Sequence, residues 1–291
     1  MPPNPPGPVL ARKRIGTKLR SLREARGLTL DQVAGALLVS VSKLSRLENA
    51  QGVPQLRDVR DLVAFYEISD HPDGRSLMRW AQDGRGKGWW MDFRDVLRPE
   101  DAEFIGYENE ATVCLQYSIP FMPGLLQTPE YTRSLISHVL PQLSADEVER
   151  RAETRRIRQQ NLIGRDGIRP LELKVIIHEA CLNQSVGSTG ALRNQLVSLQ
   201  ASSKADNIDL RVLPADAQPH LAITAMWQHF SFGEDIDRDV VCMEGLTGYQ
   251  YVDDEATVRT FERWFAELTR RSLDPVESVA RIQDAINRID S

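Results

Sequence analysis

Residues 28–49 read LTLDQVAGALLVSVSKLSRLEN, and this stretch decides the fold of the N-terminal part of the chain. Thr29 is followed three residues later by Gln32, which is the pattern of a capping box and predicts the start of a helix. Ser40 is a second N-cap residue, and only a short turn at residues 38–39 separates it from the first helix. Two short helices joined by a tight turn predict a helix-turn-helix unit.

Apolar residues at helical spacing extend this unit in both directions. Upstream, Ile15, Leu19 and Leu22 predict another helix, and Gly27 suits the position that follows its C-terminus. Downstream, further apolar residues predict one or two helices that close the core. The core positions expected after the first helix are Val33, Leu37, Leu44, Leu47, Val59, Leu62, Val63 and Phe65. The sequence therefore predicts an all-α helix-turn-helix N-terminal domain.

The charge of the chain is unevenly distributed. Residues 1–60 carry eleven Lys or Arg against four Asp or Glu, a formal charge of +7. The other residues carry 25 basic and 37 acidic side chains, a formal charge of −12. A basic domain on an acidic chain indicates that only the N-terminal domain meets phosphate, and double-stranded DNA is the expected partner.

The third helix of this domain is expected to lie in the major groove, with its N-terminal turn against the base edges. Arg46 is suited to a bidentate contact with guanine, Val41 to a thymine methyl group, and Ser42 to a base or a phosphate. Lys43 suits a phosphate and a base equally well. An alternative interpretation is that Arg46 only forms an ion pair with Glu48 or with a neighbouring helix.

Helix N-termini attract phosphate because their first backbone N–H groups have no partner within the helix. Thr29 and Ser40 begin the second and third helices, so both are expected to contact the DNA backbone. The full set of predicted DNA-binding residues is Thr29, Gln32, Ser40, Val41, Ser42, Lys43, Ser45 and Arg46.

Residues 28–34 and 39–49 resemble the helix-turn-helix family of the XRE and Cro repressors, which implies a transcriptional repressor that binds DNA. The family usually has glycine in the turn and after the Glu-Asn pair, where this chain has Leu38 and Ala50. A β-carbon disfavours the left-handed backbone of such positions. We therefore expect an altered turn, with Gly52 taking part of the second role. A homodimer is expected because one such domain contacts a single half-site.

The chain divides further by composition. Residues 1–11 are expected to be a disordered tail because they are rich in proline, and the helix-turn-helix domain then covers residues 12–70. Residues 71–100 are expected to be a linker with a short helix and an aromatic cluster. In that cluster, Trp89 and Trp90 suit a stacking platform for a base or ligand, or the docking of the second domain or a dimer partner.

Residues 101–291 mix extended and helical patterns without a regular alternation, which predicts an α+β effector domain. Strands are expected at residues 112–117, 171–177, 208–213, 226–232 and 240–243. Helices are expected at residues 103–110, 128–136, 144–162, 191–200, 256–269 and 275–289.

A second resemblance rests on residues 123–131, 155–160, 178–182, 195–196 and 212–214. These segments resemble the C-terminal domain of a large actinobacterial regulator family, described mainly as a domain of unknown function. The family includes WhiJ-type developmental regulators and antitoxin-like proteins. The resemblance implies that a small acidic partner protein binds this domain and relieves DNA binding.

The arginines between Arg150 and Arg158 have three interpretations: a wider DNA footprint, an acidic partner, or pairing with glutamates of the same helix. Arg155 and Arg158 are three residues apart on one helix face, which suits an anionic partner or ligand. With Trp89 and Trp90 they are the candidate partner or effector residues. A partner-protein switch and a small-molecule sensor both remain open. An exposed apolar patch favours the first and a closed pocket the second.

The sequence predicts no enzyme, no cofactor and no metal site. His178, Glu179 and Cys181 come nearest to a catalytic group, but adjacent residues point in different directions. His220 and His229 stand alone, and no motif for phosphate, zinc or a nucleophile occurs. Three scattered cysteines indicate a reducing cytoplasm. No apolar run reaches the roughly 18–20 residues of a membrane span.

Overall fold

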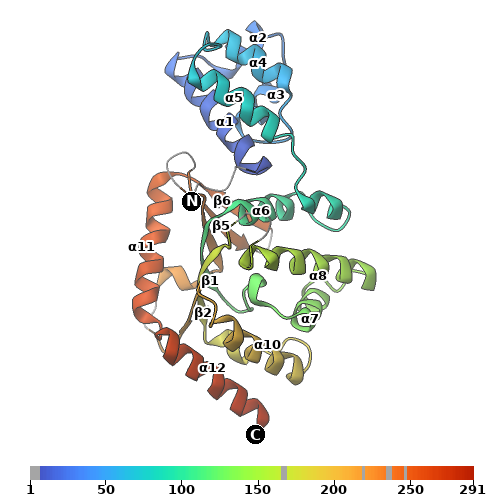
Figure 1. Ribbon diagram of the computed structural model, residues 1–291, viewed down its shortest axis with the longest axis vertical. Coiled ribbons are helices and arrows are strands. Elements are labelled where there is room, and N and C mark those ends of the chain that lie inside the picture. The colour runs from blue at the N-terminus through green and yellow to red at the C-terminus, as the bar shows by residue number, and fades with distance from the viewer. Residues whose placement is uncertain (1–6, 165–168, 218–219, 234–237, 246–247) are drawn as a thin grey trace. The chain divides into compact units, whose positions relative to one another are not determined.

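The computed structural model describes residues 7–164, 169–217, 220–233, 238–245 and 248–291 (Figure 1). The described residues form two compact units, an N-terminal unit that ends at Met91 and a C-terminal unit that begins at Asp92. Among the described helices, none is long and apolar enough to cross a membrane.

The N-terminal unit is an all-α bundle, as the sequence predicts. Its described α-helices are α1 (Pro8–Ala25), α2 (Leu30–Ala36), α3 (Val41–Glu48), α4 (Leu56–Phe65) and α5 (Pro72–Asp83), followed by the 3-10 helix η1 (Trp89–Phe93). All five α-helices bury apolar side chains in one core, which includes Ile15, Val33, Leu44, Val63 and Leu77. The helices α2 to α5 are short enough to be marginal alone, so shared apolar burial holds them in place.

The predicted helix boundaries around the turn are confirmed. Thr29 Oγ1 accepts the backbone N–H of Gln32 at 3.2 Å, and Gln32 Oε1 accepts that of Thr29 at 2.8 Å, which completes the capping box. Ser40 Oγ accepts the Lys43 N–H at 3.2 Å and caps α3. Gly27, two residues after α1, has a φ of 65° and provides the left-handed residue that ends the helix.

The turn between α2 and α3 keeps a left-handed residue although it lacks glycine. Leu38 has a φ of 54°, and Ala50, just after α3, has a φ of 58°. The expected alteration of the turn is therefore wrong, and Gly52 adds a further left-handed residue instead of replacing Ala50. Leu38 is 94% exposed, so its side chain meets no neighbour that would oppose this conformation.

The predicted N-terminal tail is too long. α1 begins at Pro8 and buries Leu10 and Ala11, so part of the expected tail of residues 1–11 is helical. Proline is compatible with the first turn of a helix because that turn needs no N–H from it. Residues 1–6 lie outside the described residues.

The short helix expected within residues 71–100 is present as α5, but α5 belongs to the N-terminal unit and not to a linker. Leu77 and Ala81 of α5 lie in the core of the N-terminal unit, and α5 packs against α1. Gly74 permits this packing, because a β-carbon there would lie 2.0 Å from the backbone oxygen of Ile68. The N-terminal unit therefore extends past the predicted boundary.

The C-terminal unit contains a six-stranded mixed sheet with the strand order β3-β2-β1-β4-β5-β6 (Figure 1). The strands are β1 (Val113–Ser118), β2 (Glu172–His178), β3 (Ile208–Leu213), β4 (Trp227–Ser231), β5 (Val240–Gly245) and β6 (Gly248–Val252). β1, β2 and β3 are parallel to one another, whereas β4, β5 and β6 join by antiparallel pairing. The expected α+β class is confirmed.

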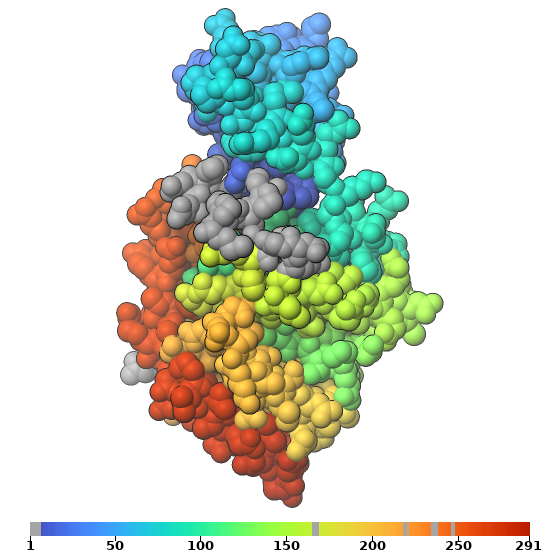
Figure 2. All heavy atoms as spheres, viewed as in Figure 1, coloured from blue at the N-terminus to red at the C-terminus, as the bar shows by residue number. Residues whose placement is uncertain are grey.

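Helices pack on both faces of this sheet. Among its described residues, the C-terminal unit has the α-helices α6 (Pro99–Glu110), α7 (Pro129–Val139), α8 (Ala145–Gln159), α9 (Ala180–Asn183), α10 (Thr189–Ser202), α11 (Glu255–Arg271) and α12 (Pro275–Asp290). Phe261 of α11 contacts Trp227 on one face, whereas Phe104 of α6 contacts Phe230 on the other. Figure 2 shows α8, α10 and α12 at the surface of the unit.

Candidate nucleic-acid interface

The helix α3 turns one face to the core and the other to solvent. Leu44 is buried in the core of the N-terminal unit. The exposed or half-buried side chains of α3 include Val41, Ser42, Lys43, Ser45 and Arg46. Thr29, Gln32 and Ser40 are exposed, and their side chains cap the two helices. The residues predicted to contact bases therefore share one solvent-facing helix.

A buried ion pair fixes the end of α3 to α1. Arg23 donates to both carboxylate oxygens of Glu48, each at 2.8 Å, and the Glu48 side chain is 2% exposed. Arg20 donates to the backbone oxygen of Glu48 at 3.3 Å. Gly16 permits the close approach of α1, since a β-carbon there would lie 2.5 Å from the same oxygen. The sequence did not predict this ion pair, because Arg23 and Glu48 lie in separate helices.

The Arg23–Glu48 pair argues against the alternative interpretation of Arg46. Because Glu48 is paired with Arg23, the expected alternative of an Arg46–Glu48 ion pair is wrong. Arg46 is exposed, and it forms no ion pair with any residue that the structure describes. Its guanidinium therefore keeps its donors for an outside acceptor.

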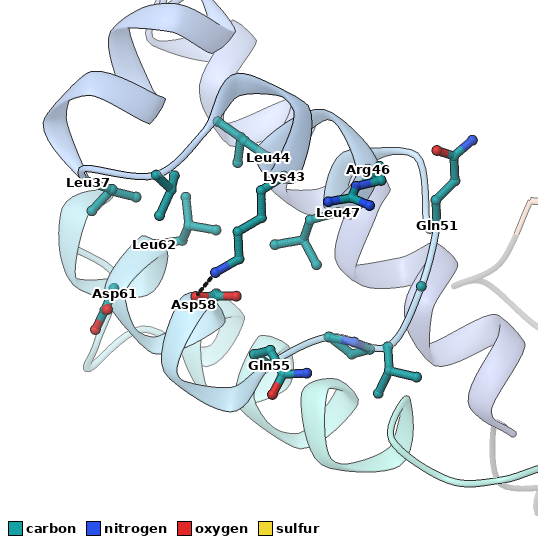
Figure 3. A pocket seen from close by; sticks show the side chains of 14 residues that line it. Leu37, Lys43, Leu44, Arg46, Leu47, Gln51, Gln55, Asp58, Asp61 and Leu62 are labelled. Carbon is teal, nitrogen blue, oxygen red and sulfur yellow. Dashed lines mark hydrogen bonds and ion pairs between the residues drawn. The ribbon is translucent and has the colours of Figure 1, made fainter.

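A cavity of about 270 Å³ lies beside α3, between that helix and the start of α4 (Figure 3). Leu44 and Leu62 give it apolar walls, and Arg46 lines it. Lys43 Nζ donates to Asp58 Oδ1 at 2.7 Å across this cavity (Figure 3). An ion pair of this kind is worth about 0–1 kcal/mol, so DNA phosphate can compete with Asp58 for Lys43 at little cost.

The aromatic cluster does not form an open platform. Trp90 is 4% exposed, and its ring meets the ring of Trp89 edge-on at a centroid distance of 5.9 Å. A stacking platform needs an accessible ring face. The expectation that Trp90 stacks on a base or ligand is therefore wrong, and its role is that of a buried aromatic side chain.

The arginines of α8 are mostly paired, and chiefly with residues of other elements. Arg158 donates to Glu108 Oε1 and Oε2, both at 2.7 Å, and the two side chains are 11% and 4% exposed. Arg150 pairs with Asp95 at 2.7 Å. The expected pairing within one helix occurs for Arg156, which contacts the nearby Glu153. Arg158 is therefore not available as a surface contact for an anionic partner.

Arg155 has no carboxylate partner among the described residues. Its Nη1 donates to the neutral amide oxygen of Gln127 at 2.6 Å. Burial, together with the neighbouring positive charge of Arg158, lowers the pKa of Arg155 to about 10. A β-carbon on Gly124 would lie 3.4 Å from Arg158 Nη2, so the loop before α7 lies directly against the arginine pair. The negative charges of Glu244 and Glu108 partly offset this lowering of the pKa, but neither carboxylate forms an ion pair with Arg155 among the described residues. The remaining guanidinium donors are suited to an anionic ligand.

The group near His178 is structural. Glu179 accepts from Arg281 at 2.8 Å and from the backbone N–H of Ala215 at 2.9 Å. Cys181 is buried, and burial raises the pKa of its thiol to about 12. A neutral thiol is a poor nucleophile, so this arrangement does not favour catalysis.

The expectation that His229 stands alone is wrong. Its side chain lies close to the carboxylates of Asp239 and Glu262, with one possible ligand atom of each residue within 4.8 Å of the others. Sequence spacing did not show this cluster because the three residues lie in different segments of the fold.

The geometry of α2, the turn and α3 defines the N-terminal unit as a helix-turn-helix domain. Residues 14–73 match a family model described as a helix-turn-helix domain. Residues 101–284 match the family described as a domain of unknown function, DUF5753, and the chain belongs to this family.

One curated relative is the HTH-type transcriptional regulator DdrOP3 of Deinococcus deserti, which is 43% identical over 58 residues. The match covers 20% of this chain and 45% of the relative, so the chain spans less than half the length of that protein. No solved structure matches the chain.

Proposed function

We propose that the protein is a sequence-specific DNA-binding transcriptional regulator of the XRE type that acts as a homodimeric repressor. The observation that supports this proposal is the exposed face of α3, which carries Val41, Ser42 and an Arg46 that forms no ion pair with a described residue. The Arg23–Glu48 pair holds this face in place before DNA arrives. A preorganised helix with a free guanidinium is suited to bidentate readout of guanine.

Selection of binding sites from a random duplex library tests this proposal. The selected operator is then measured with Arg46→Ala and with Arg57→Ala, which removes the same charge from an exposed position on α4. We expect Arg46→Ala to cost about 1–3 kcal/mol and to relax the preference at one base pair. Arg57→Ala is expected to leave the sequence preference unchanged. Identical base preferences for Arg46→Ala and the unmodified protein would exclude Arg46 from base readout.

We further propose that the C-terminal unit binds a small partner protein that modulates DNA binding. The resemblance of residues 123–131 and 155–160 to antitoxin-like regulators supports this role. The alternative is a small anionic effector, which Arg155 favours because its hydrogen bond goes to the neutral Gln127 and it forms no ion pair with a described residue.

Native mass spectrometry of protein purified gently from its source cells separates the two. A bound small protein supports the partner switch, whereas a bound anion of a few hundred daltons supports the sensor. Arg155→Gln removes the positive charge and is expected to lower the affinity for the anion. The base preference of the protein on DNA is expected to stay unchanged, because Arg155 lies in the C-terminal unit.

A further inference from the structure

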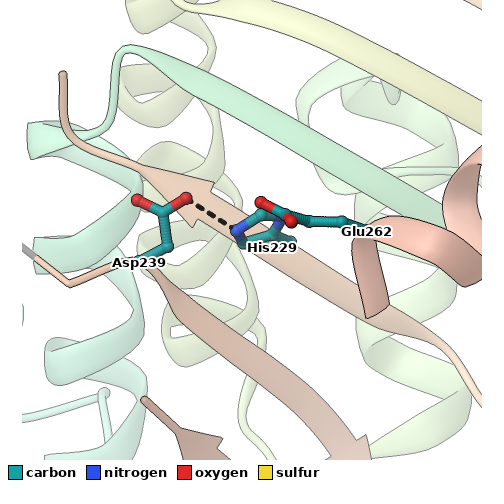
Figure 4. Close-up of side chains that lie close together, drawn as sticks. All are labelled: His229, Asp239 and Glu262. Carbon is teal, nitrogen blue, oxygen red and sulfur yellow. Dashed lines mark hydrogen bonds and ion pairs between the residues drawn. The ribbon is translucent and has the colours of Figure 1, made fainter. Parts of the chain in front are cut away.

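Three side chains of metal-ligand type meet on the α11 side of the sheet (Figure 4). His229 belongs to β4, Asp239 directly precedes β5, and Glu262 lies on α11. One nitrogen of His229 and one carboxylate oxygen of each acid lie within 4.8 Å of one another. The three segments converge from different parts of the chain, so the cluster is a product of the tertiary fold.

The imidazole of His229 is only partly satisfied. Its Nε2 lies 2.9 Å from Asp239 Oδ2, and the side chain is 1% exposed. Its Nδ1 is buried and has no hydrogen-bond partner in the described part of the chain. A buried ring nitrogen without a partner is uncommon. A metal ion binds the ring nitrogen that carries the lone pair, and the nitrogen beside Asp239 is Nε2. With a metal ion on Nε2, the proton of the ring would lie on Nδ1.

The two carboxylates have no lysine or arginine partner in the described part of the chain. Ser231 donates to Asp239 Oδ2 at 2.7 Å, but neither Asp239 nor Glu262 pairs with Lys or Arg among the described residues. The arginines that flank Glu262 on α11 are engaged elsewhere, since Arg259 pairs with Glu255 and Arg263 donates to Thr260. Two nearby carboxylates without a cation repel each other, and a divalent ion would balance their charge.

We propose that His229, Asp239 and Glu262 bind a divalent transition-metal ion of the Zn²⁺ type. One imidazole and two carboxylates match the nitrogen and oxygen ligands that zinc accepts, with water at the fourth position. In a tetrahedral zinc site with bonds of about 2.0–2.1 Å, neighbouring ligand atoms lie about 3.3 Å apart. His229 Nε2 and Asp239 Oδ2 are 2.9 Å apart, which is close to this value. Glu262 is exposed, and rotation of its side chain would be needed to bring its carboxylate to the distance of a zinc ligand.

The test is zinc binding by the full-length protein after removal of metal with a chelator, measured by competition with a chromophoric chelator. We expect one zinc ion per chain. Asp239→Asn and Glu262→Gln are expected to raise the Kd roughly 10- to 100-fold. Glu255→Gln is the matched control, because it makes the same change on the same exposed helix outside the cluster.

Cobalt substitution provides an independent readout, because cobalt coordinated by nitrogen and oxygen lacks the intense charge-transfer band of a cobalt–thiolate bond. Such a band would place the metal on a cysteine and overturn the proposal. Failure to bind zinc, or a Kd that Glu262→Gln and Asp239→Asn leave unchanged, would overturn it as well. Glu262 is exposed, so its variant is expected to fold, and circular dichroism checks this point.

Discussion

At the scale of single residues, Gly16 controls how closely α1 approaches α3. A β-carbon at Gly16 would lie 2.5 Å from the backbone oxygen of Glu48 and 3.0 Å from that of Leu47. Backbone atoms cannot rotate away, so Gly16→Ala must push the two helices apart. We expect the free energy of unfolding of the N-terminal unit to fall by about 1–3 kcal/mol in urea titrations.

Gly35→Ala is the matched control for this prediction. Gly35 lies within α2, and nothing stands within 4 Å of the position that its β-carbon would occupy. Because alanine is the better helix former, we expect this variant to gain up to about 1 kcal/mol. Equal losses in both variants would show that the α1–α3 approach is not the cause.

The three cysteines are expected to resist modification in the folded protein. All are buried and free. Burial raises the pKa of Cys181 to about 12 and holds the pKa values of Cys114 and Cys242 above their usual range. Since the thiolate is the reactive form, an aromatic disulfide reagent at pH 8 should react slowly with native protein and rapidly with three thiols after unfolding. A rapidly labelled thiol in the native state would contradict this burial.

The sequence predicted residues well where local spacing determines their position. The exposed positions of α3 follow from helical periodicity, so the solvent-facing placement of Val41 and Arg46 could be predicted. The partners of Glu48 and Arg158 lie in other helices. Their contacts depend on tertiary packing, which the spacing of one sequence does not report.

At the scale of elements, the turn between α2 and α3 bears backbone strain at Leu38. This residue has a φ of 54° and a fully solvated side chain, so it loses little burial when shortened. Leu38→Gly is expected to raise the free energy of unfolding by about 0.5–1 kcal/mol, because glycine adopts the left-handed region without a β-carbon clash.

Ala36→Gly is the control for the turn, since Ala36 is an exposed residue at the end of the helical part of α2. Glycine in a helix is less favourable than alanine by about 1 kcal/mol, so the control should shift stability in the opposite direction. Loss of stability in both variants would mean that Leu38 makes a contact that outweighs its strain. Thermal unfolding followed by circular dichroism measures both.

Helix starts were the most predictable elements because they depend on a few neighbouring residues. Ser144 and Glu147 form the expected capping box of α8, and Thr128 caps α7. The strand β6 was not predicted, since it is short and none of its residues is fully buried. The packing of α5 in the N-terminal core was not predicted. The turn-like residues 71–74 before it and the glycine-rich residues 83–88 after it are typical of a linker.

At the scale of the whole molecule, the N-terminal unit offers one recognition helix per chain. A helix of this kind reads a single half-site, and one half-site gives little discrimination against the remaining genome. Two chains related by a two-fold axis would read two half-sites about one helical turn of DNA apart, 10–10.5 base pairs. The proposed repressor therefore has to bind as a dimer to be selective.

This argument predicts two chains on each selected operator. Each chain has a mass of 32.9 kDa, so the mass of the complex, measured by light scattering, distinguishes one bound chain from two. We expect scrambling of one half-site to reduce the affinity towards the non-specific level, because each mismatched base pair costs about 1–3 kcal/mol. Scrambling the flanking sequence is the control and should have no effect. The dimeric mode would be excluded if one chain were bound per operator and scrambling a half-site left the affinity unchanged. The specificity would then have to come from contacts outside α3.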